Sequence, residues 1–287
     1  MATDKPLIAI VGPTASGKTG LAIQLAKKFN GAVICADSRT VYRGMNIGTA
    51  KPTVAEMDGV PHYMFDMVNP NDTFTLYDFQ RLANTYIQEI RDNGQVPFVV
   101  GGSGLYIDSI LFDYKLGDAP NNKLRQKLEK LSIGDLLALI KKQHIEMPIN
   151  FNNKRHLVRA IEQNGVNKMR RDEIIENAYV VGIATDKAVI EQRIRERAAF
   201  MLHAGLVDEV RNLVAKYGAD CEPLRKNLYG EVQQYLHNEL TRDGLIERMV
   251  IVDRQLAKKQ MTWFRRNEQI EWFDLAGADK RVSGMLS

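Results

Sequence analysis

The chain contains four short apolar runs in which hydrophobic residues are continuous rather than alternating. They occupy residues 7–11, 32–36, 96–100 and 179–183. Stretches with helical spacing alternate with them, at residues 18–29, 76–91 and 187–202. Continuous hydrophobicity is typical of parallel strands that helices cover on both faces. The pattern therefore predicts an α/β core built on a doubly wound parallel sheet.

The pattern changes from about residue 115, where the sequence becomes polar and helical and strand-like runs stop. Leu124, Leu128 and Leu131 recur there at helical spacing. We therefore expect a helical insertion at residues 115–171, and a core formed by residues 1–114 together with 172–287. Beyond residue 183 the sequence stays helical to about residue 266, and residues 277–287 are expected to form a frayed tail.

A glycine-rich loop follows the first apolar run and fits the pattern G-x-x-x-x-G-K-[ST]. Its residues are Gly12, Pro13, Thr14, Ala15, Ser16, Gly17, Lys18 and Thr19. Glycines let backbone N–H groups surround phosphate oxygens, the next helix adds its positive end, and Lys18 adds a charge. The Thr19 hydroxyl suits Mg²⁺. The loop predicts a polyphosphate site but does not say which polyphosphate binds.

Asp37 follows the second apolar run. Ligands of open α/β sheets bind beyond the carboxyl ends of the strands, so we expect Asp37 beside the phosphate loop. A carboxylate there can be a general base or a metal partner; alternatively, Asp37 or Ser38 caps a helix. The sequence contains no Asn-Lys-x-Asp motif, which argues against a switch GTPase. None of the apolar runs ends in an acidic pair, which argues against an ATPase motor.

Composition predicts an ordinary globular protein, because 287 residues with 45% hydrophobic content can bury a substantial core. No apolar window approaches the roughly 18 residues of a membrane span, and the first residues lack the apolar core of a signal peptide. We therefore expect a cytoplasmic protein. Cys35 and Cys221 lie far apart and predict neither a disulfide framework nor a zinc site.

Basic residues gather in two places, although the net charge is only +4. Residues 141–171 hold eight Lys or Arg against two acids: Lys141, Lys142, Lys154, Arg155, Arg159, Lys168, Arg170 and Arg171 against Glu146 and Glu162. The second cluster is Arg254, Lys258, Lys259, Arg265 and Arg266, interleaved with Trp263 and Phe264. Each cluster is either a solvated helix face or a surface that binds nucleic acid.

Several further motifs follow the phosphate loop in the sequence. They are the segment 37–52, Val60-Pro61-His62-Tyr63, Gly101-Gly102-Ser103-Gly104-Leu105-Tyr106, Arg159-Ala160-Ile161-Glu162, and the segment 254–266. Together with the phosphate loop, and in this order, they resemble the motifs of the tRNA dimethylallyltransferases, also called tRNA isopentenyltransferases. The resemblance extends over residues 8–273 and implies a sheet of the P-loop nucleotide-kinase-like type.

The resemblance also implies an activity. The enzyme would move a dimethylallyl group from dimethylallyl diphosphate to the exocyclic N6 amine of the adenosine next to the tRNA anticodon, releasing diphosphate. Asp37 would be the general base, assisted by Ser103. Lys18, Thr19 with Mg²⁺ as the cofactor, and Arg197 would stabilise the departing diphosphate; Arg193 and Arg197 are otherwise surface charges. A monomer that binds the tRNA anticodon stem-loop and no membrane is expected.

Family matching further implies which residues contact the tRNA. They are Asp37, Ser38, Arg39, Thr40, Ser103, Arg125, Arg155, His156, Leu157, Val158, Arg159, Arg225, Lys226, Asn227, Leu228, Tyr229 and Gly230. The sequence departs from the family pattern at Thr40, often a glutamine, at Tyr63, a histidine, and at His156, an arginine. Asn227-Leu228-Tyr229-Gly230-Glu231 replaces Ile-Gly-Tyr-Lys-Glu, and the insertion is short.

Three other functions stay open. A small-molecule kinase shares the phosphate loop and would transfer phosphate from ATP. A nucleotide-dependent RNA-binding module without catalysis would explain the departures from the family pattern. Prenyl transfer to free adenine nucleotides would use the same catalytic residues, although the basic insertion argues against it.

Overall fold

The computed structural model describes residues 5–116, 122–148, 150–164 and 170–287. The chain divides into two compact units, Met1–Ile107 with Glu176–Ser287, and Asp108–Ile175. The expected insertion, 115–171, falls within the second unit, and its Lys168 lies outside the described residues. Within the described parts of the chain, no helix combines the length and the apolar character that crossing a membrane requires.

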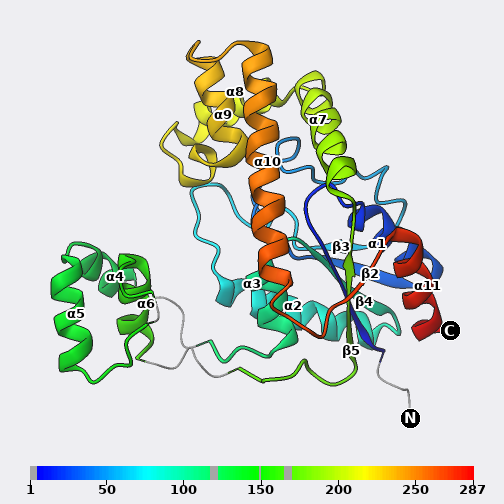
Figure 1. Ribbon diagram of the computed structural model, residues 1–287, viewed down its shortest axis with the longest axis horizontal. Coiled ribbons are helices and arrows are strands. Elements are labelled where there is room, and N and C mark those ends of the chain that lie inside the picture. Colours follow the sequence, from blue (N-terminus) through cyan, green and yellow to red (C-terminus); the bar gives the residue numbers. More distant parts are fainter. Residues whose placement is uncertain (1–4, 117–121, 149, 165–169) are drawn as a thin grey trace. The chain divides into compact units, whose positions relative to one another are not determined.

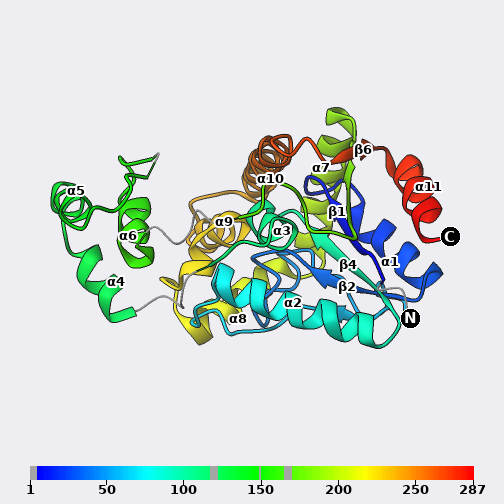
Figure 2. The same cartoon turned by 90° about the horizontal axis from the view of Figure 1, so that it is seen from below.

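A six-stranded parallel sheet with the order β3-β2-β4-β1-β5-β6 lies at the centre of the first unit (Figures 1 and 2). The strands are β1 (Leu7–Val11), β2 (Gly31–Cys35), β3 (His62–Tyr63), β4 (Val96–Gly101), β5 (Ala178–Ile183) and β6 (Glu271–Phe273). The predicted α/β fold class is confirmed. The edge strands β3 and β6 were not predicted, because two or three residues are too few to give a hydrophobic pattern.

Helices cover both faces of the sheet. On one face, α1 (Lys18–Lys28) and α11 (Leu275–Leu286) enclose an apolar core with Ile8 and Ile10 of β1. On strands, alternate residues point to opposite faces. The helix α2 (Leu76–Asp92) packs on β2 and β4, and α3 (Gly104–Leu111) follows β4.

The expectation of a frayed tail at residues 277–287 was wrong. Ala278 and Val282 of α11 are fully buried in the core that α11 shares with α1. The Asp274 side chain accepts a hydrogen bond from the Gly277 N–H at 2.7 Å and so caps the first turn of the helix. Tertiary packing of a small apolar face orders this segment, despite its place at the end of the sequence.

Four further helices form a bundle within the first unit, at the top of Figure 1. They are α7 (Lys187–His203), α8 (Leu206–Tyr217), α9 (Asn227–Leu236) and α10 (Arg242–Phe264), with a short 3₁₀ helix at Glu222–Arg225 before α9. Their shared core includes Leu228, Tyr229 and Met249, and it also contains Met45 from the loop after β2. The loop that carries Asp37 is therefore anchored in this bundle.

The second unit contains α4 (Asn122–Glu129), α5 (Ile133–Lys142) and α6 (Lys154–Gln163), together with the last residues of α3. These helices enclose a small apolar core of their own that includes Leu128, Leu136 and Leu157. Within the same unit, the segments before α4 and after α6 are joined by a backbone hydrogen bond from the Ile175 N–H to the Leu111 carbonyl, 2.7 Å long.

Candidate active site

The glycine-rich loop connects β1 to α1 at the carboxyl edge of the sheet. Gly17 has a φ of 90°, a left-handed conformation that glycine adopts without strain. A Cβ atom at this position would also lie 3.0 Å from Leu275 Cδ1. The helix α1 begins directly afterwards, at Lys18, so its unpaired N–H groups and its positive end adjoin the loop. This geometry suits the binding of phosphate groups.

Lys18 folds back over the loop. Its Nζ atom donates a hydrogen bond to the Pro13 carbonyl at 3.1 Å. Burial lowers the pKa of Lys18 to about 8, with Asp37 acting in the opposite direction and Arg197 reinforcing the decrease. An anion bound in the loop would favour the charged form of this amine.

Two arginines of α7 hold the loop. Arg193 Nη1 donates to the Ala15 carbonyl at 3.3 Å. Arg197 Nη2 donates to Thr14 Oγ1 at 2.8 Å and to Asp253 Oδ2 at 2.6 Å. The alternative that these arginines are surface charges is therefore wrong, because both contact the loop directly.

Asp37 lies in the loop just beyond the carboxyl end of β2. Its Oδ1 atom accepts a hydrogen bond from the Arg39 N–H at 2.8 Å. Nearby, Ser103 Oγ accepts from the Ser38 N–H at 3.0 Å. The described helix that next follows β2 begins only at Leu76, so neither Asp37 nor Ser38 caps a helix. Asp37 instead closes a local turn, and Ser103 brings the loop after β4 beside it.

Two adjoining cavities meet at Asp37. The first, of about 190 Å³, is lined by the polar residues Lys18, Thr19 and Arg197. The apolar residues Val33, Pro52, Phe65 and Val100 also line it. The second, of about 80 Å³, is lined by the α9 residues Asn227, Leu228 and Tyr229 among others. Lys18, Asp37 and Arg197 line both cavities, so a ligand in either one would adjoin the same three charged groups.

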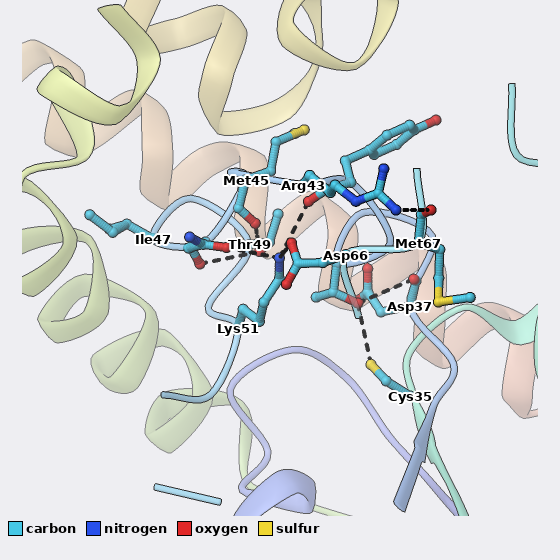
Figure 3. A network of polar contacts seen from close by, with 12 residues as sticks. Cys35, Asp37, Arg43, Met45, Ile47, Thr49, Lys51, Asp66 and Met67 are labelled. Carbon is cyan, nitrogen blue, oxygen red and sulfur yellow. Dashed lines mark hydrogen bonds and ion pairs between the residues drawn. The ribbon is translucent and has the colours of Figure 1, made fainter. Parts of the chain in front are cut away.

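A buried lysine shapes the loop that walls both cavities (Figure 3). The Lys51 side chain is only 6% exposed and forms an ion pair with Asp66 Oδ1 at 2.7 Å. Its Nζ atom also donates to Asn46 Oδ1 at 2.8 Å and to the Tyr42 carbonyl at 3.3 Å. These three acceptors match the three donors of an ammonium group. Lys51 therefore fixes Thr49 and Ala50 in the cavity wall, a role that sequence analysis did not assign.

Glu209 of α8 holds the same loop from its other side. Its carboxylate accepts backbone N–H groups from Asn46, Ile47 and Gly48 at distances of 2.8–3.1 Å. It also accepts the Tyr229 hydroxyl at 2.6 Å. A Cβ atom on Gly48 would lie 2.6 Å from the Tyr229 ring, so only glycine fits there. Sequence analysis assigned no role to Glu209.

The residues expected to contact tRNA fall into two groups in the first unit. Ser38, Arg225, Lys226 and Asn227 are exposed, whereas Thr40, Leu228 and Tyr229 are buried. Arg39 donates to the Pro223 carbonyl at 2.9 Å and to the Lys226 carbonyl at 3.3 Å, which ties the Asp37 loop to the start of α9. The buried members contribute packing, and the exposed ones form the accessible surface.

In the second unit, the residues expected to contact tRNA also divide into exposed and buried ones. Arg155 and His156 are exposed, whereas Leu157 and Val158 lie in the apolar core. The Arg125 guanidinium pairs with Glu162 through two hydrogen bonds of 2.6 and 2.8 Å, and Arg159 Nη1 lies 3.3 Å from the same carboxylate. The Glu162 side chain is only 3% exposed. A cavity of about 520 Å³ is lined by Arg125, Glu129, Lys154, Arg155, Val158 and Arg159.

Comparison with known proteins gives a consistent result. The family model described as IPP transferase matches residues 40–267, and the one described as isopentenyl transferase matches residues 5–74. A tRNA dimethylallyltransferase of Bacillus cereus (strain B4264) is 37% identical over 287 residues, which cover 94% of this chain and 90% of that protein. The one from Bacillus subtilis (strain 168) is 37% identical over 288 residues, covering 95% and 92%.

Solved structures agree. The full-length tRNA isopentenylpyrophosphate transferase of Bacillus halodurans has a TM-score of 0.74 and 36% identity, covering 99% of this chain and 97% of that chain. A eukaryotic dimethylallyltransferase whose structures describe its action on tRNA has a TM-score of 0.79 and 25% identity, covering 94% of this chain and 74% of that chain.

Proposed function

The chain belongs to the IPP transferase family of tRNA dimethylallyltransferases, and on that premise we propose how its site carries out prenyl transfer to tRNA. The donor is dimethylallyl diphosphate, and the acceptor is the exocyclic N6 amine of the adenosine next to the anticodon. A bond forms between that nitrogen and the allylic carbon, the bond from this carbon to the diphosphate oxygen breaks, and diphosphate leaves.

The observation that carries this proposal is the pair of cavities that meet at Asp37. In the first cavity, Lys18 and Arg197 supply positive charge for the diphosphate, and the wall of Val33, Phe65 and Val100 suits a small isoprenoid chain. Arg197 Nε is buried without a partner among the described residues, so a diphosphate oxygen would satisfy it. The second cavity has room for part of an extruded base.

In this proposal, Asp37 takes the proton that the amine loses. An exocyclic amine is a weak nucleophile until its proton has an acceptor, and a carboxylate between donor and acceptor cavities provides one. The positive charge of Lys18 and Arg197 stabilises the leaving diphosphate as its negative charge develops.

The residues present also fit a magnesium ion. The Thr19 hydroxyl at the start of α1 and the Asp37 carboxylate line the same cavity, and Mg²⁺ favours such oxygen ligands together with phosphate oxygens and water. The ion would neutralise charge on the diphosphate. In the described residues, no group of three or more His, Cys, Asp or Glu side chains forms a protein-only metal site. A monomeric state stays a prediction.

The decisive experiment is incubation of the purified protein with undermodified tRNA, dimethylallyl diphosphate and Mg²⁺, followed by mass analysis of the nucleosides. We expect an adenosine that carries one added dimethylallyl group. Parallel reactions with free adenine nucleotides, and with ATP and small metabolites, test prenyl transfer to nucleotides and the kinase alternative. Product in either of these reactions but none on tRNA would contradict the proposal.

A further inference from the structure

The long helix α10 buries two polar side chains on the face that it turns toward the site. Asp253 is 5% exposed and Gln260 is 9% exposed. They are seven residues apart, about two helical turns, so they lie on the same side of the helix. Buried polar groups need hydrogen-bond partners. Asp253 is paired with Arg197, and Gln260 is paired with the phosphate loop.

Asp253 acts on the loop through Arg197. Its Oδ2 atom accepts from Arg197 Nη2 at 2.6 Å, and the same Nη2 atom donates to Thr14 Oγ1 at 2.8 Å. Both hydrogens of this nitrogen are therefore used in directing the guanidinium. The contact leaves Nε without a partner among the described residues, in a side chain that lines both cavities.

Gln260 contacts two loops at once. Its Oε1 atom accepts the Thr14 N–H at 2.7 Å. Its Nε2 atom sits against the backbone of Gly102, where an added Cβ would lie only 2.1 Å away. One turn further on, Trp263 packs in the same manner on Gly104, where the corresponding distance to its Cδ1 atom is 2.1 Å. The helix therefore sets the separation between the phosphate loop and the loop that carries Ser103.

We propose that Asp253 and Gln260 are positioning residues for the prenyl transfer. Asp253 orients the Arg197 guanidinium toward the diphosphate, and Gln260 fixes the phosphate loop relative to Ser103 and the acceptor side. This inference rests on the proposed function. It explains why a helix face carries a buried carboxylate and a buried amide at positions where apolar residues would pack without needing partners.

The test of Asp253 separates the orientation of the Arg197 guanidinium from the binding of diphosphate. Asp253→Asn keeps an oxygen for Arg197 but removes the charge. We expect the single-turnover rate of prenyl transfer to fall about 10-fold or more, as for a misaligned catalytic group. The affinity for inorganic diphosphate with Mg²⁺ should not fall, because a negative charge near the anion has been removed.

A matched control is Glu247→Gln. It breaks a different ion pair between α10 and α7, that of Glu247 with Arg195 at 2.5 Å, on the exposed side of the helices. We expect wild-type rates and melting temperature. A wild-type rate for Asp253→Asn would overturn the assignment, and so would a parallel loss of diphosphate affinity, which indicates collapse of the site rather than misorientation.

Gln260 is tested with a pair of variants. Gln260→Leu keeps the volume but removes the acceptor for the Thr14 N–H, and Gln260→Glu retains an acceptor oxygen. We expect the leucine variant to transfer about 10-fold more slowly and the glutamate variant to recover most of that loss. Gln255→Leu, an exposed position on the same helix, is the control. The affinity for tRNA should be unchanged throughout.

Equal rates for Gln260→Leu and wild type, or no recovery in Gln260→Glu, would overturn the role of Gln260. Failure of the proposed function gives a different result, because the wild-type protein itself would then leave tRNA unmodified in the presence of dimethylallyl diphosphate.

Discussion

The Asp37 carboxylate has a local and a chemical role, which can be separated by substitution. Its Oδ1 atom closes the turn to the Arg39 N–H, and asparagine can keep that hydrogen bond. Asparagine cannot accept the amine proton. We therefore expect Asp37→Asn to lower the single-turnover rate by roughly 10²-fold or more, with little change in tRNA affinity. Near wild-type turnover would make Asp37 a turn residue only.

Lys18 makes diphosphate binding depend on pH. Because its pKa in the free site is about 8, the amine is charged at pH 7 and mostly neutral at pH 9. A bound anion raises this pKa, so affinity is constant below pH 8 and falls above it. We expect inorganic diphosphate with Mg²⁺ to bind about 10-fold more weakly at pH 9 than at pH 7.

Lys18→Arg serves as the control for that measurement, since a guanidinium stays charged across this range. Any pH dependence left in this variant belongs to the ligand or to other groups. An equally steep decrease in both proteins would show that Lys18 does not titrate in the site.

Sequence analysis identified Lys18 and Asp37 as site residues, but not the residues that hold them in place. Lys18 belongs to a local motif, and Asp37 directly follows a strand, so neighbouring residues in the sequence were enough to predict both. The contact of Thr14 with Gln260 spans 246 residues of sequence, and only the fold reveals it. The available signal was the polar pair Asp253 and Gln260 at helical spacing among buried positions such as Ala257 and Phe264.

The helix α6 of the basic insertion carries two kinds of arginine, one in an ion pair and one exposed. Arg159 is engaged with the buried Glu162, whereas Arg155 is exposed and has no ion-pair partner among the described residues. We expect Arg155→Ala to reduce the slope of log tRNA affinity against log salt by about one unit, because one phosphate contact is lost. Filter binding across a range of salt concentrations measures this slope.

Arg159→Ala should behave differently. It weakens the cluster that joins α6 to α4 through Glu162 and Arg125, so its main effect should be a lower melting temperature. A change in salt slope as large as that of Arg155→Ala, with unchanged stability, would place Arg159 on the phosphates instead.

An element could be predicted from the sequence where its hydrophobic pattern was strong. The four longer strands were found because their apolar runs are almost entirely buried, and β1 was predicted to the residue, at Leu7–Val11. The helix α11 was missed because its buried residues, Ala278 and Val282, are few and small. Position near the end of the sequence then favoured disorder, which tertiary packing overrides.

At the scale of the whole molecule, the two units have separate apolar cores. All the groups proposed for chemistry lie in the first unit, whereas the exposed cations Arg155 and Lys142 lie in the second. Within the second unit, the Ile175 N–H donates to the Leu111 carbonyl, and Arg170 Nη1 donates to the Tyr114 hydroxyl at 3.3 Å. Residues 111–114 and 170–175, which flank the three helices in sequence, therefore lie side by side.

This arrangement predicts that the insertion can be replaced without loss of the catalytic unit. A variant in which a short Gly-Ser linker joins Tyr114 to Arg170 should fold cooperatively and bind inorganic diphosphate with Mg²⁺ as the full chain does, because the sheet, α1 and α10 are intact. Its affinity for tRNA should fall by about 10-fold or more, with a shallower salt slope, since the cations of α6 are gone. Calorimetry and binding titrations measure these properties. Full tRNA modification by this variant would show that the insertion is dispensable, and an unfolded product would show that the two units depend on each other for stability.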